Sequence, residues 1–441
     1  MPQPVPLKVC HVYAGTEGGR WVFDQLEELR NAHGCEVSVV VGGREGRTVD
    51  LFRAAGIDVK VFNFRLKGFA AWCSIPLRVL RLAVWLRRER FDVVQSHLIQ
   101  STLFARPAAW LADVPVRLEM ITGPFFIQTP AIRALETATA TMETGIIPSC
   151  RLTGDLYRAA GIPARLVQEV LYYGPRAGRF DPASATPAGL RAEFGLSPDA
   201  PLIGSVAMFY PRYPDSDLVP SEARGRHVKG QDVLIAAMPR VLREFPEARL
   251  VLVGSGSGPR AAEAEAQIRD LVRAAGIEDR VLFTGWRPDV ASIYVDLNVS
   301  VQPSINDNLG GTIESLLMAR PTIATRVGGL VDSVVDGETG LLVPPADADA
   351  LAEAILTLLR DPARAAALGQ AGRARMLVGF TRERTGAGLA ALYRRQRDVA
   401  PSAYRLGRGL ARIVPAALIH APRLARALLW DYWLRERLLR R

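Results

Sequence analysis

A short stretch near residue 300, in which a buried strand runs into the start of a helix, sets the architecture expected of the whole chain. The run from Val295 to Val301, which is apolar at every second position, is typical of a buried strand. Pro303 ends that strand, because proline cannot donate to the next rung of a hydrogen-bond ladder. A polar turn and the pair Gly310-Gly311 follow, and a helical segment then reaches Ala319. Strands that alternate with helices in this way predict an α/β protein with a parallel sheet.

The residues between this strand and helix suit a nucleotide diphosphate. Bare N–H groups and the positive end of the helix dipole favour a phosphate at such a terminus. Glycines at the same place let a ligand approach the backbone closely. Glu314, in the first turn of the helix, can accept hydrogen bonds from a ribose diol, as an acidic residue does in dinucleotide-binding folds.

Length and composition predict a globular protein of more than one domain. The chain has 441 residues, too many for one core, while 49% hydrophobic and 23% charged residues are ordinary values. No run approaches about 18 uncharged apolar residues, so no membrane span is expected, and residues 1–6 carry no apolar signal-peptide core. The four cysteines, Cys10, Cys35, Cys73 and Cys150, lack metal or redox spacing, which favours buried free thiols in the cytoplasm.

The positive charge is concentrated at the end of the chain. The net charge is +10, and residues 399–441 hold nine arginines against Asp431 and Glu436, a balance of +7. The remaining +3 gives no reason to expect nucleic acid as a partner. Leucines on one half of a helical wheel and arginines opposite predict that this tail is a basic helix on an anionic membrane surface. A packed C-terminal helix and an oligomer contact are the alternatives.

A second basic segment and two loops have competing interpretations. The segment 66–90 is either a membrane-surface helix or a solvated helix with one core face. Asp215-Ser216-Asp217 has the composition of a metal site, but a polar surface loop is favoured. Gly254-Ser255-Gly256-Ser257-Gly258 has the glycines of a dinucleotide fingerprint at the wrong spacing.

The stretch around Glu314, together with residues 319–325, 327–329 and 336–345, resembles the retaining glycosyltransferases of family 4. The order and spacing match over roughly fifty residues, which makes the motif specific. The resemblance implies a GT-B fold, in which two Rossmann-like domains face a central cleft. The implied divisions are an N-terminal acceptor-side domain (1–180), a linker (181–199), a nucleotide-sugar domain (200–378), a helix returning to the first domain (379–398) and the basic tail (399–441).

The resemblance also assigns roles to single residues. Lys229, with the helix that begins near Gly310, would stabilise the departing diphosphate, and Glu314 would hold the ribose. The predicted catalytic residues are Lys229, Glu314 and His97, and the predicted donor-binding residues are Gly18, Gly19, Arg212, Arg226, Gly254, Asn306, Asp307, Asn308, Leu309, Gly310, Gly311, Thr312 and Glu314. No metal and no cofactor is predicted, because Lys229 and the helix dipole can neutralise the diphosphate.

Some of these assignments have structural alternatives. Gly18-Gly19 is either a donor loop or a tight turn, and Lys229 either a diphosphate ligand or a solvated lysine. His97 either bonds acceptor or sugar hydroxyls or caps the next helix. Two positions depart from the family pattern: Asn306 replaces the first of two glutamates, and Thr122 replaces a histidine before a glycine.

The implied function is transfer, with retention, of a hexosyl or N-acetylhexosaminyl group from a nucleotide diphosphate sugar. A UDP-sugar is the favoured donor and GDP-mannose the alternative, and the acceptor is lipid-linked or a saccharide. This activity belongs to the synthesis of bacterial surface polysaccharide or glycolipid, in the cytoplasm or on the inner face of the plasma membrane. Two alternatives remain: a catalytically weak partner of another transferase, suggested by Asn306 and Thr122, and a sugar-nucleotide epimerase.

Overall fold

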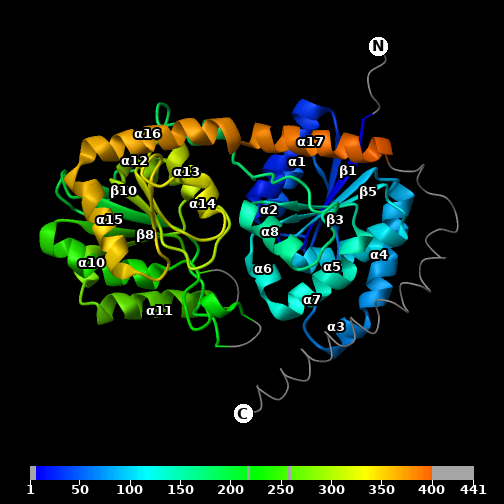
Figure 1. Cartoon of the computed structure of the whole chain (residues 1–441), viewed down its shortest axis with the longest axis horizontal. Coiled ribbons are helices and arrows are strands. Elements are labelled where there is room, and N and C mark those ends of the chain that lie inside the picture. The colour runs from blue at the N-terminus through cyan, green and yellow to red at the C-terminus, as the bar shows by residue number, and fades with distance from the viewer. Residues whose placement is uncertain (1–5, 216–218, 257–259, 400–441) are drawn as a thin grey trace. The chain divides into compact units, whose positions relative to one another are not determined.

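The computed structural model describes residues 6–215, 219–256 and 260–399, which form two compact units. Of the described residues, unit 1 holds those up to Thr122, then Phe126–Tyr173 and Arg382–Val399. Unit 2 holds Gly123–Phe125 and Gly174–Thr381. Each unit is an α/β layer structure built on one sheet (Figure 1).

Each unit contains a six-stranded parallel sheet, with strand order β3-β2-β1-β4-β5-β6 in unit 1 and β12-β11-β10-β7-β8-β9 in unit 2. The strands of unit 1 are β1 (Lys8–Tyr13), β2 (Glu36–Val41), β3 (Asp58–Val61), β4 (Val93–His97), β5 (Val116–Ile121) and β6 (Gly145–Pro148). Those of unit 2 are β7 (Leu202–Val206), β8 (Arg249–Val253), β9 (Val281–Gly285), β10 (Val299–Gln302), β11 (Thr322–Thr325) and β12 (Leu341–Val343).

Helices connect the strands in both units, as parallel strands require. The helices of the first part of the chain are α1 (Arg20–His33), α2 (Arg47–Ala54), α3 (Phe69–Cys73), α4 (Ile75–Glu89), α5 (Ile99–Leu111), α6 (Phe125–Gln128), α7 (Pro130–Thr139) and α8 (Arg151–Ala159). Those that follow are α9 (Leu190–Glu193), α10 (Gln231–Glu244), α11 (Ala261–Ala274), α12 (Val290–Asp296), α13 (Thr312–Leu317), α14 (Leu330–Ser333), α15 (Ala348–Arg360), α16 (Pro362–Gly379) and α17 (Arg382–Val399). Within the described ranges, no helix is long and apolar enough to cross a membrane.

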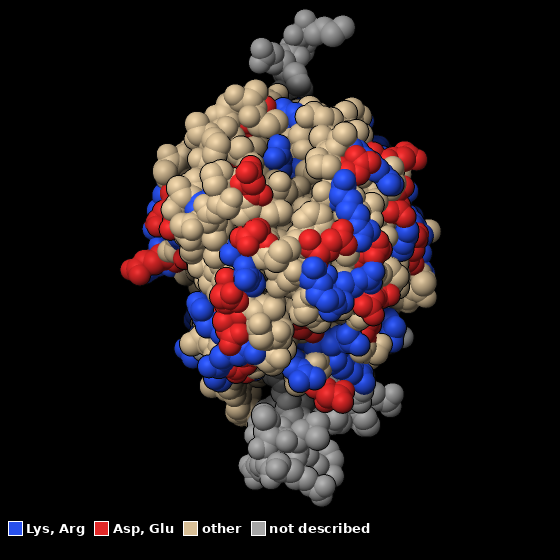
Figure 2. Space-filling view, turned by 90° about the vertical axis from the view of Figure 1, so that its left-hand side faces the viewer, with Lys and Arg blue, Asp and Glu red and all other residues tan. Residues whose placement is uncertain are grey.

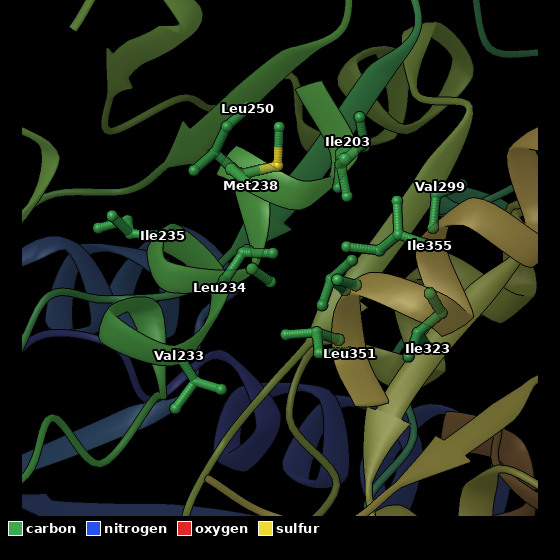
Figure 3. Close-up of a cluster of buried hydrophobic side chains, with 14 of the residues drawn as sticks. Ile203, Val233, Leu234, Ile235, Met238, Leu250, Val299, Ile323, Leu351 and Ile355 are labelled. Atoms are coloured by element: carbon green, nitrogen blue, oxygen red, sulfur yellow. The ribbon is translucent and has the colours of Figure 1, made fainter. Parts of the chain in front are cut away.

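The cores follow from the alternation of side chains along buried strands. In unit 1, Cys10 and Val12 of β1 pack with α4 and α5, while Val9 faces the opposite way, toward α1 and α17. In unit 2, Figure 3 shows Ile203, Leu250, Val299 and Ile323 of the sheet beside side chains of α10 and α15. These apolar contacts fix the two sheets and therefore the loops that leave their carboxyl ends.

The helix α17 returns the end of the described chain to unit 1, as predicted for residues 379–398. It lies alongside α1 (Figure 1), and Arg382 forms an ion pair with Glu28 at 3.1 Å. Its Tyr393 hydroxyl lies 3.0 Å from His11 Nε2 and donates to Gln95 Oε1 at 2.7 Å. These buried polar contacts tie α17 to the sheet.

Several local predictions were wrong. Residues 295 and 296 end the helix α12, so the run 295–301 is a helix end followed by a strand rather than one strand. The segment 66–90 breaks at Ser74 into α3 and α4. Cys73 is exposed, whereas the other three cysteines are buried as expected.

The predicted linker, residues 181–199, lies in unit 2. Its helix α9 is held there because Leu190 N donates to Asp296 Oδ2 at 2.8 Å, and Arg191 donates to Asn298 Oδ1 at 2.8 Å. The structure therefore divides the units after Tyr173 rather than after residue 180. The basic tail falls outside the described residues, as do Ser216 and Asp217 of the metal-like loop.

A buried ion cluster joins α5, α7 and β5 in unit 1. Arg106 contacts Glu119 at 2.5 Å, Glu136 at 2.8 Å and Glu143 at 3.2 Å, all of them buried. Burial disfavours the charge on Arg106, but the three carboxylates outweigh that effect and hold the guanidinium pKa well above its usual value. Burial, followed by the charge of Glu136, raises the pKa of Glu119. Arg106 pairs with all three carboxylates, and the cluster therefore depends on it.

We expect Arg106→Met to lower the free energy of unfolding by about 3–5 kcal/mol at pH 7.5, because it leaves buried carboxylates without their cation. The loss should be smaller at pH 5. Burial raises the folded-state pKa values of Glu119 and Glu143 above the unfolded-state value of about 4.3, so protonation favours the folded state as the pH falls. Urea unfolding at both pH values measures the effect. Arg88→Met, on the exposed face of α4, is the control and should change stability by less than about 0.5 kcal/mol. An equal loss at the two pH values would contradict the explanation.

Candidate functional site

The candidate site lies at the carboxyl ends of β7 and β10, where the strand order of unit 2 reverses. Ligands in open parallel sheets bind at such a switch point. The loop after β10 meets the loop before α10, because Ile305 N donates to Val228 O at 2.9 Å. At Gly230, which has φ of +67°, a Cβ atom would lie 1.9 Å from the Pro303 carbonyl oxygen. Only glycine permits this approach, and it brings Lys229 to the edge of the sheet.

Lys229 is held by an ion pair rather than by solvent. Its Nζ donates to Asp307 Oδ2 at 2.7 Å, and its side chain is 21% exposed. Burial disfavours the ammonium, but the nearby carboxylate outweighs burial and raises the Lys229 pKa. Lys229 therefore carries its charge throughout the neutral range, and its interpretation as a solvated surface lysine is wrong.

Asp307 positions Lys229, although the sequence suggested that it holds sugar hydroxyls. The same Oδ2 accepts from Ser304 Oγ at 2.8 Å, and Oδ1 accepts from Asn308 N at 2.9 Å. Both carboxylate oxygens are thus engaged within the protein. The carboxylate orients the ammonium and fixes the turn that follows β10.

Asn308 presents an amide with no partner. Its side chain is 4% exposed, and within the described structure neither Oδ1 nor Nδ2 makes a hydrogen bond. A buried amide without partners is costly, so such a group marks a place where a ligand can supply them. The residues 123–125 cluster with unit 2, and a Cβ at Gly123 would lie 3.2 Å from Asn308 Cβ. The segment that follows Thr122 therefore reaches this amide.

Asn306 lies beside a carboxylate that the sequence did not reveal. Its Nδ2 donates to Glu222 Oε1 at 3.2 Å. Glu222 belongs to the irregular loop 210–226 that precedes Lys229, and it is exposed. The position where the family has a glutamate thus holds an amide, and the insertion brings a carboxylate to it. The sequence shows only that Glu222 is an acidic residue in an unusually long loop, and this was the only signal that could have identified it.

The remaining predicted residues of this stretch lie at the start of α13. Glu314 lies in the first turn and is half-buried, and the pKa of Tyr294 is raised first by burial and then by the Glu314 charge. The Tyr294 hydroxyl donates to Gly311 O at 3.3 Å. Gly310 has φ of +51°, Thr312 Oγ1 lies 2.8 Å from Ser333 Oγ, and the Leu309 side chain is buried. Only the backbone of Leu309 can therefore face a ligand.

The structure gives less support for the other donor-binding residues predicted in unit 2. The Arg212 guanidinium donates to the Gly225 carbonyl, while Arg226 is exposed three residues before Lys229. Gly254 has φ of +140°, and a Cβ there would lie 2.0 Å from the Ala207 carbonyl oxygen, so strand packing already explains this glycine. Donor contacts by these three residues stay predictions.

The predicted site residues of unit 1 lie at the switch point of its own sheet, between β1 and β4. Gly18 and Gly19 form the loop after β1, and Gly19 N donates to Thr48 Oγ1 at 3.0 Å. His97 is fully buried, and its Nε2 lies 3.0 Å from His11 Nδ1. Burial and then the neighbouring His11 lower the His97 pKa, so the ring is neutral.

His97 does not cap α5, because that helix begins without any side-chain cap, and the capping alternative is wrong. Its Nδ1 is buried and has no partner within the described residues. The role of His97 toward an acceptor stays a prediction. Among the described residues, no group of three or more His, Cys, Asp or Glu side chains could hold a metal ion. The absence of a metal requirement is likewise still a prediction.

Both halves of the chain match family models. Residues 17–174 match a glycosyl transferase 4-like domain, and residues 222–361 match glycosyl transferases group 1. The chain is 31% identical over 327 residues to a D-inositol 3-phosphate glycosyltransferase of Kineococcus radiotolerans, covering 70% of this chain and 68% of that one. It is also 31% identical over 258 residues to a GDP-mannose-dependent alpha-(1-6)-phosphatidylinositol monomannoside mannosyltransferase of Mycolicibacterium smegmatis, covering 56% and 61%. Across the first curated relatives, the matched region spans about half to two thirds of their length.

The fold is shared with solved structures. The Anabaena protein HepE, in complex with UDP and glucose, superposes with a TM-score of 0.73 at 18% identity, covering 88% of this chain and 99% of that one. Together with the two parallel sheets, this likeness confirms the predicted α/β class and GT-B fold.

We expect Lys229→Ala to lower turnover of a nucleotide diphosphate sugar by about a hundredfold or more, because negative charge grows on the leaving phosphate during bond cleavage. The affinity for the donor should fall by less. Steady-state release of nucleoside diphosphate, with calorimetry for binding, separates the two effects. Arg243→Ala, an exposed cation on α10, is the control. Full turnover in a folded Lys229→Ala variant would remove Lys229 from the phosphate site.

Proposed function

The chain belongs to glycosyltransferase family 4, the group 1 family, and we propose that it moves a hexosyl group from a nucleotide diphosphate sugar to a lipid-linked or saccharide acceptor. One observation supports this proposal most strongly. Asp307 orients the Lys229 ammonium at the switch point of a parallel sheet, next to the unpartnered amide of Asn308. A cation for the diphosphate and an amide for sugar hydroxyls are what such a donor needs.

The chemistry proposed for this edge is charge stabilisation. Asp307 is engaged by Lys229, Ser304 and Asn308 N, so it does not act as a nucleophile. Lys229 would neutralise the departing diphosphate, and Glu314 would accept hydrogen bonds from the ribose. Retention at the anomeric carbon would then follow the route usual for the family, in which the leaving diphosphate draws the acceptor proton.

The relatives guide the choice of substrates. The solved HepE structure holds UDP and glucose, which supports a UDP-sugar as the favoured donor. The Mycolicibacterium relative uses GDP-mannose, which keeps GDP-mannose as the alternative. Relatives named for phosphatidylinositol mannosides and inositol phosphate support a glycolipid or surface polysaccharide product. The place that we propose for its synthesis is the cytoplasm, at the inner membrane face.

A donor panel tests this function. The protein is incubated with UDP-glucose, GDP-mannose and ADP-glucose, and the products are followed by mass spectrometry. We expect slow release of one nucleoside diphosphate without acceptor, and Glu314→Gln should weaken binding of that donor by about 1.5–3 kcal/mol because a charged acceptor is lost. An isomerised sugar would indicate an epimerase instead, and no turnover of any donor would favour the partner-protein alternative. Unchanged donor affinity in Glu314→Gln would remove Glu314 from the site.

A second prediction concerns the carboxylate next to Asn306. Glu222→Gln should lower turnover about tenfold or more, the effect of a hydrogen bond to a charged group, with little change in affinity for the nucleoside diphosphate. Asn306→Glu alone should be worse, because it opposes two carboxylates. The double variant Asn306→Glu/Glu222→Gln should recover activity, since it restores one carboxylate and one amide. Glu247→Gln, exposed elsewhere in unit 2, is the control. Equal activity in all four variants would exclude Glu222 from the site.

A further inference from the structure

One face of α4 carries an apolar stripe that nothing in the described structure covers. Leu77, Leu80 and Val84 are 51%, 50% and 43% exposed. With Arg81 and Arg88 they recur at intervals of three and four residues, which places all five on one side of the helix. The opposite side, including Leu82 and Leu86, is buried against the sheet. The helix therefore has its core contacts already, and the exposed stripe is a second apolar surface.

The preceding helix, α3, contacts α4 and also carries an exposed apolar side chain. Phe69 on α3 is 72% exposed and follows Lys67 and the turn at Gly68. We call the exposed residues Lys67, Phe69, Leu77, Leu80, Arg81, Val84 and Arg88 the α3–α4 face. A large exposed aromatic ring together with leucines and cations is typical of a segment that lies at a membrane interface.

The charge of this region is strongly one-sided. Residues 60–90 hold eight basic residues and a single acid, Glu89, a balance of +7, and Glu89 forms an ion pair with Lys8 at 3.1 Å. The helix α11 of unit 2 differs: Arg260 at its N-cap, and Arg269 and Arg273 within it, each have a carboxylate partner. Figure 2 shows basic and acidic side chains interspersed over one side of the molecule. Within the described ranges, the cations of the α3–α4 face, Lys67, Arg81 and Arg88, form no ion pair with a carboxylate.

A basic groove of about 310 Å³ adjoins the stripe, lined by Lys60, Val61, Phe62, Asn63, Arg78, Arg81, Leu82 and Trp85. Arg78 is 6% exposed, and its terminal nitrogens donate to the carbonyls of Asn63, Arg65 and Ala71. Its buried Nε has no partner within the described residues. Lys60 Nζ lies 5.5 Å from the centre of the Trp85 ring. A small anionic group such as a phosphate would meet at least two cations in this groove.

We propose that the α3–α4 face docks on an anionic lipid bilayer, with the leucine stripe in the headgroup region and the groove beside it receiving a lipid phosphate. The positive charge of the α3–α4 face favours an anionic bilayer over two other partners. The tail of this chain carries +7, and a second copy would present the same basic face, so both would be repelled. An anionic surface supplies the missing negative charge and accepts the apolar side chains. This docking does not depend on glycosyl transfer.

Co-sedimentation of the full chain with vesicles tests the proposal. Vesicles of phosphatidylcholine with about 30 mol% phosphatidylglycerol are compared with pure phosphatidylcholine, and we expect binding only to the first, weakened by salt. Arg81→Glu/Arg88→Glu should reduce the partition coefficient at least about thirtyfold, the equivalent of about 1 kcal/mol for each basic residue lost. Leu80→Gln/Val84→Gln should reduce it about fivefold or more, because less apolar surface enters the interface.

The controls separate this surface from others. Arg243→Glu/Arg364→Glu makes the same change in net charge with two exposed arginines of unit 2 and should bind vesicles nearly as the wild type does. All variants should melt near the wild-type temperature and release nucleoside diphosphate from a soluble donor at the same rate. Wild-type vesicle binding by both α4 variants would overturn the proposal and place any membrane contact elsewhere, including residues 400–441. Loss of a dimer in the α4 variants, without vesicle binding by the wild type, would overturn it in favour of a second copy.

Discussion

The ion pair between Lys229 and Asp307 is the interaction on which the candidate site depends, because it joins the two loops at the switch point of the unit 2 sheet. The Asp307 carboxylate balances the charge of the half-buried Lys229 ammonium before any ligand binds, and the lysine side chain remains partly exposed. Removing one partner of such an ion pair destabilises a protein far more than forming the pair stabilises it. The role of the pair is therefore to hold the Lys229 ammonium in position. The backbone is shaped to allow it: a Cβ at Gly328 would lie 1.6 Å from the Asp307 carbonyl oxygen.

Polar groups are distributed differently around the two switch points. In unit 1, burial lowers the pKa of His11 to about 3, and its imidazole contacts only other buried groups, Tyr393 and His97. That network stabilises the return of α17 to the sheet. In unit 2, by contrast, the amide of Asn308 has no partner within the described residues. The hydrogen bonds of His11 suit a structural role, whereas the unpartnered Asn308 amide, like the unpartnered Nδ1 of His97, suits a ligand.

The sequence predicted the fold well, because alternation of buried strands and helices is a strong local signal. Asp347, for example, is of a residue type that favours helix N-caps, and it accepts from Ala350 N at 2.8 Å at the start of α15. The failures arose where local pattern is ambiguous. In residues 295–301 the apolar side chains fall at every second position, which is a strand pattern, although residues 295 and 296 end the helix α12. Glu222 could not be predicted from spacing, because its approach to Asn306 depends on the path of a long irregular loop.

The central claim is that the Lys229 edge binds the diphosphate of a nucleotide. Calorimetry of the wild-type protein with UDP and with uridine, and with GDP and guanosine, tests it most directly. The account predicts that one nucleoside diphosphate binds at least about a hundredfold more tightly than its nucleoside, because only the diphosphate meets the ammonium and the helix terminus. A nucleoside that binds as tightly as its diphosphate would contradict it.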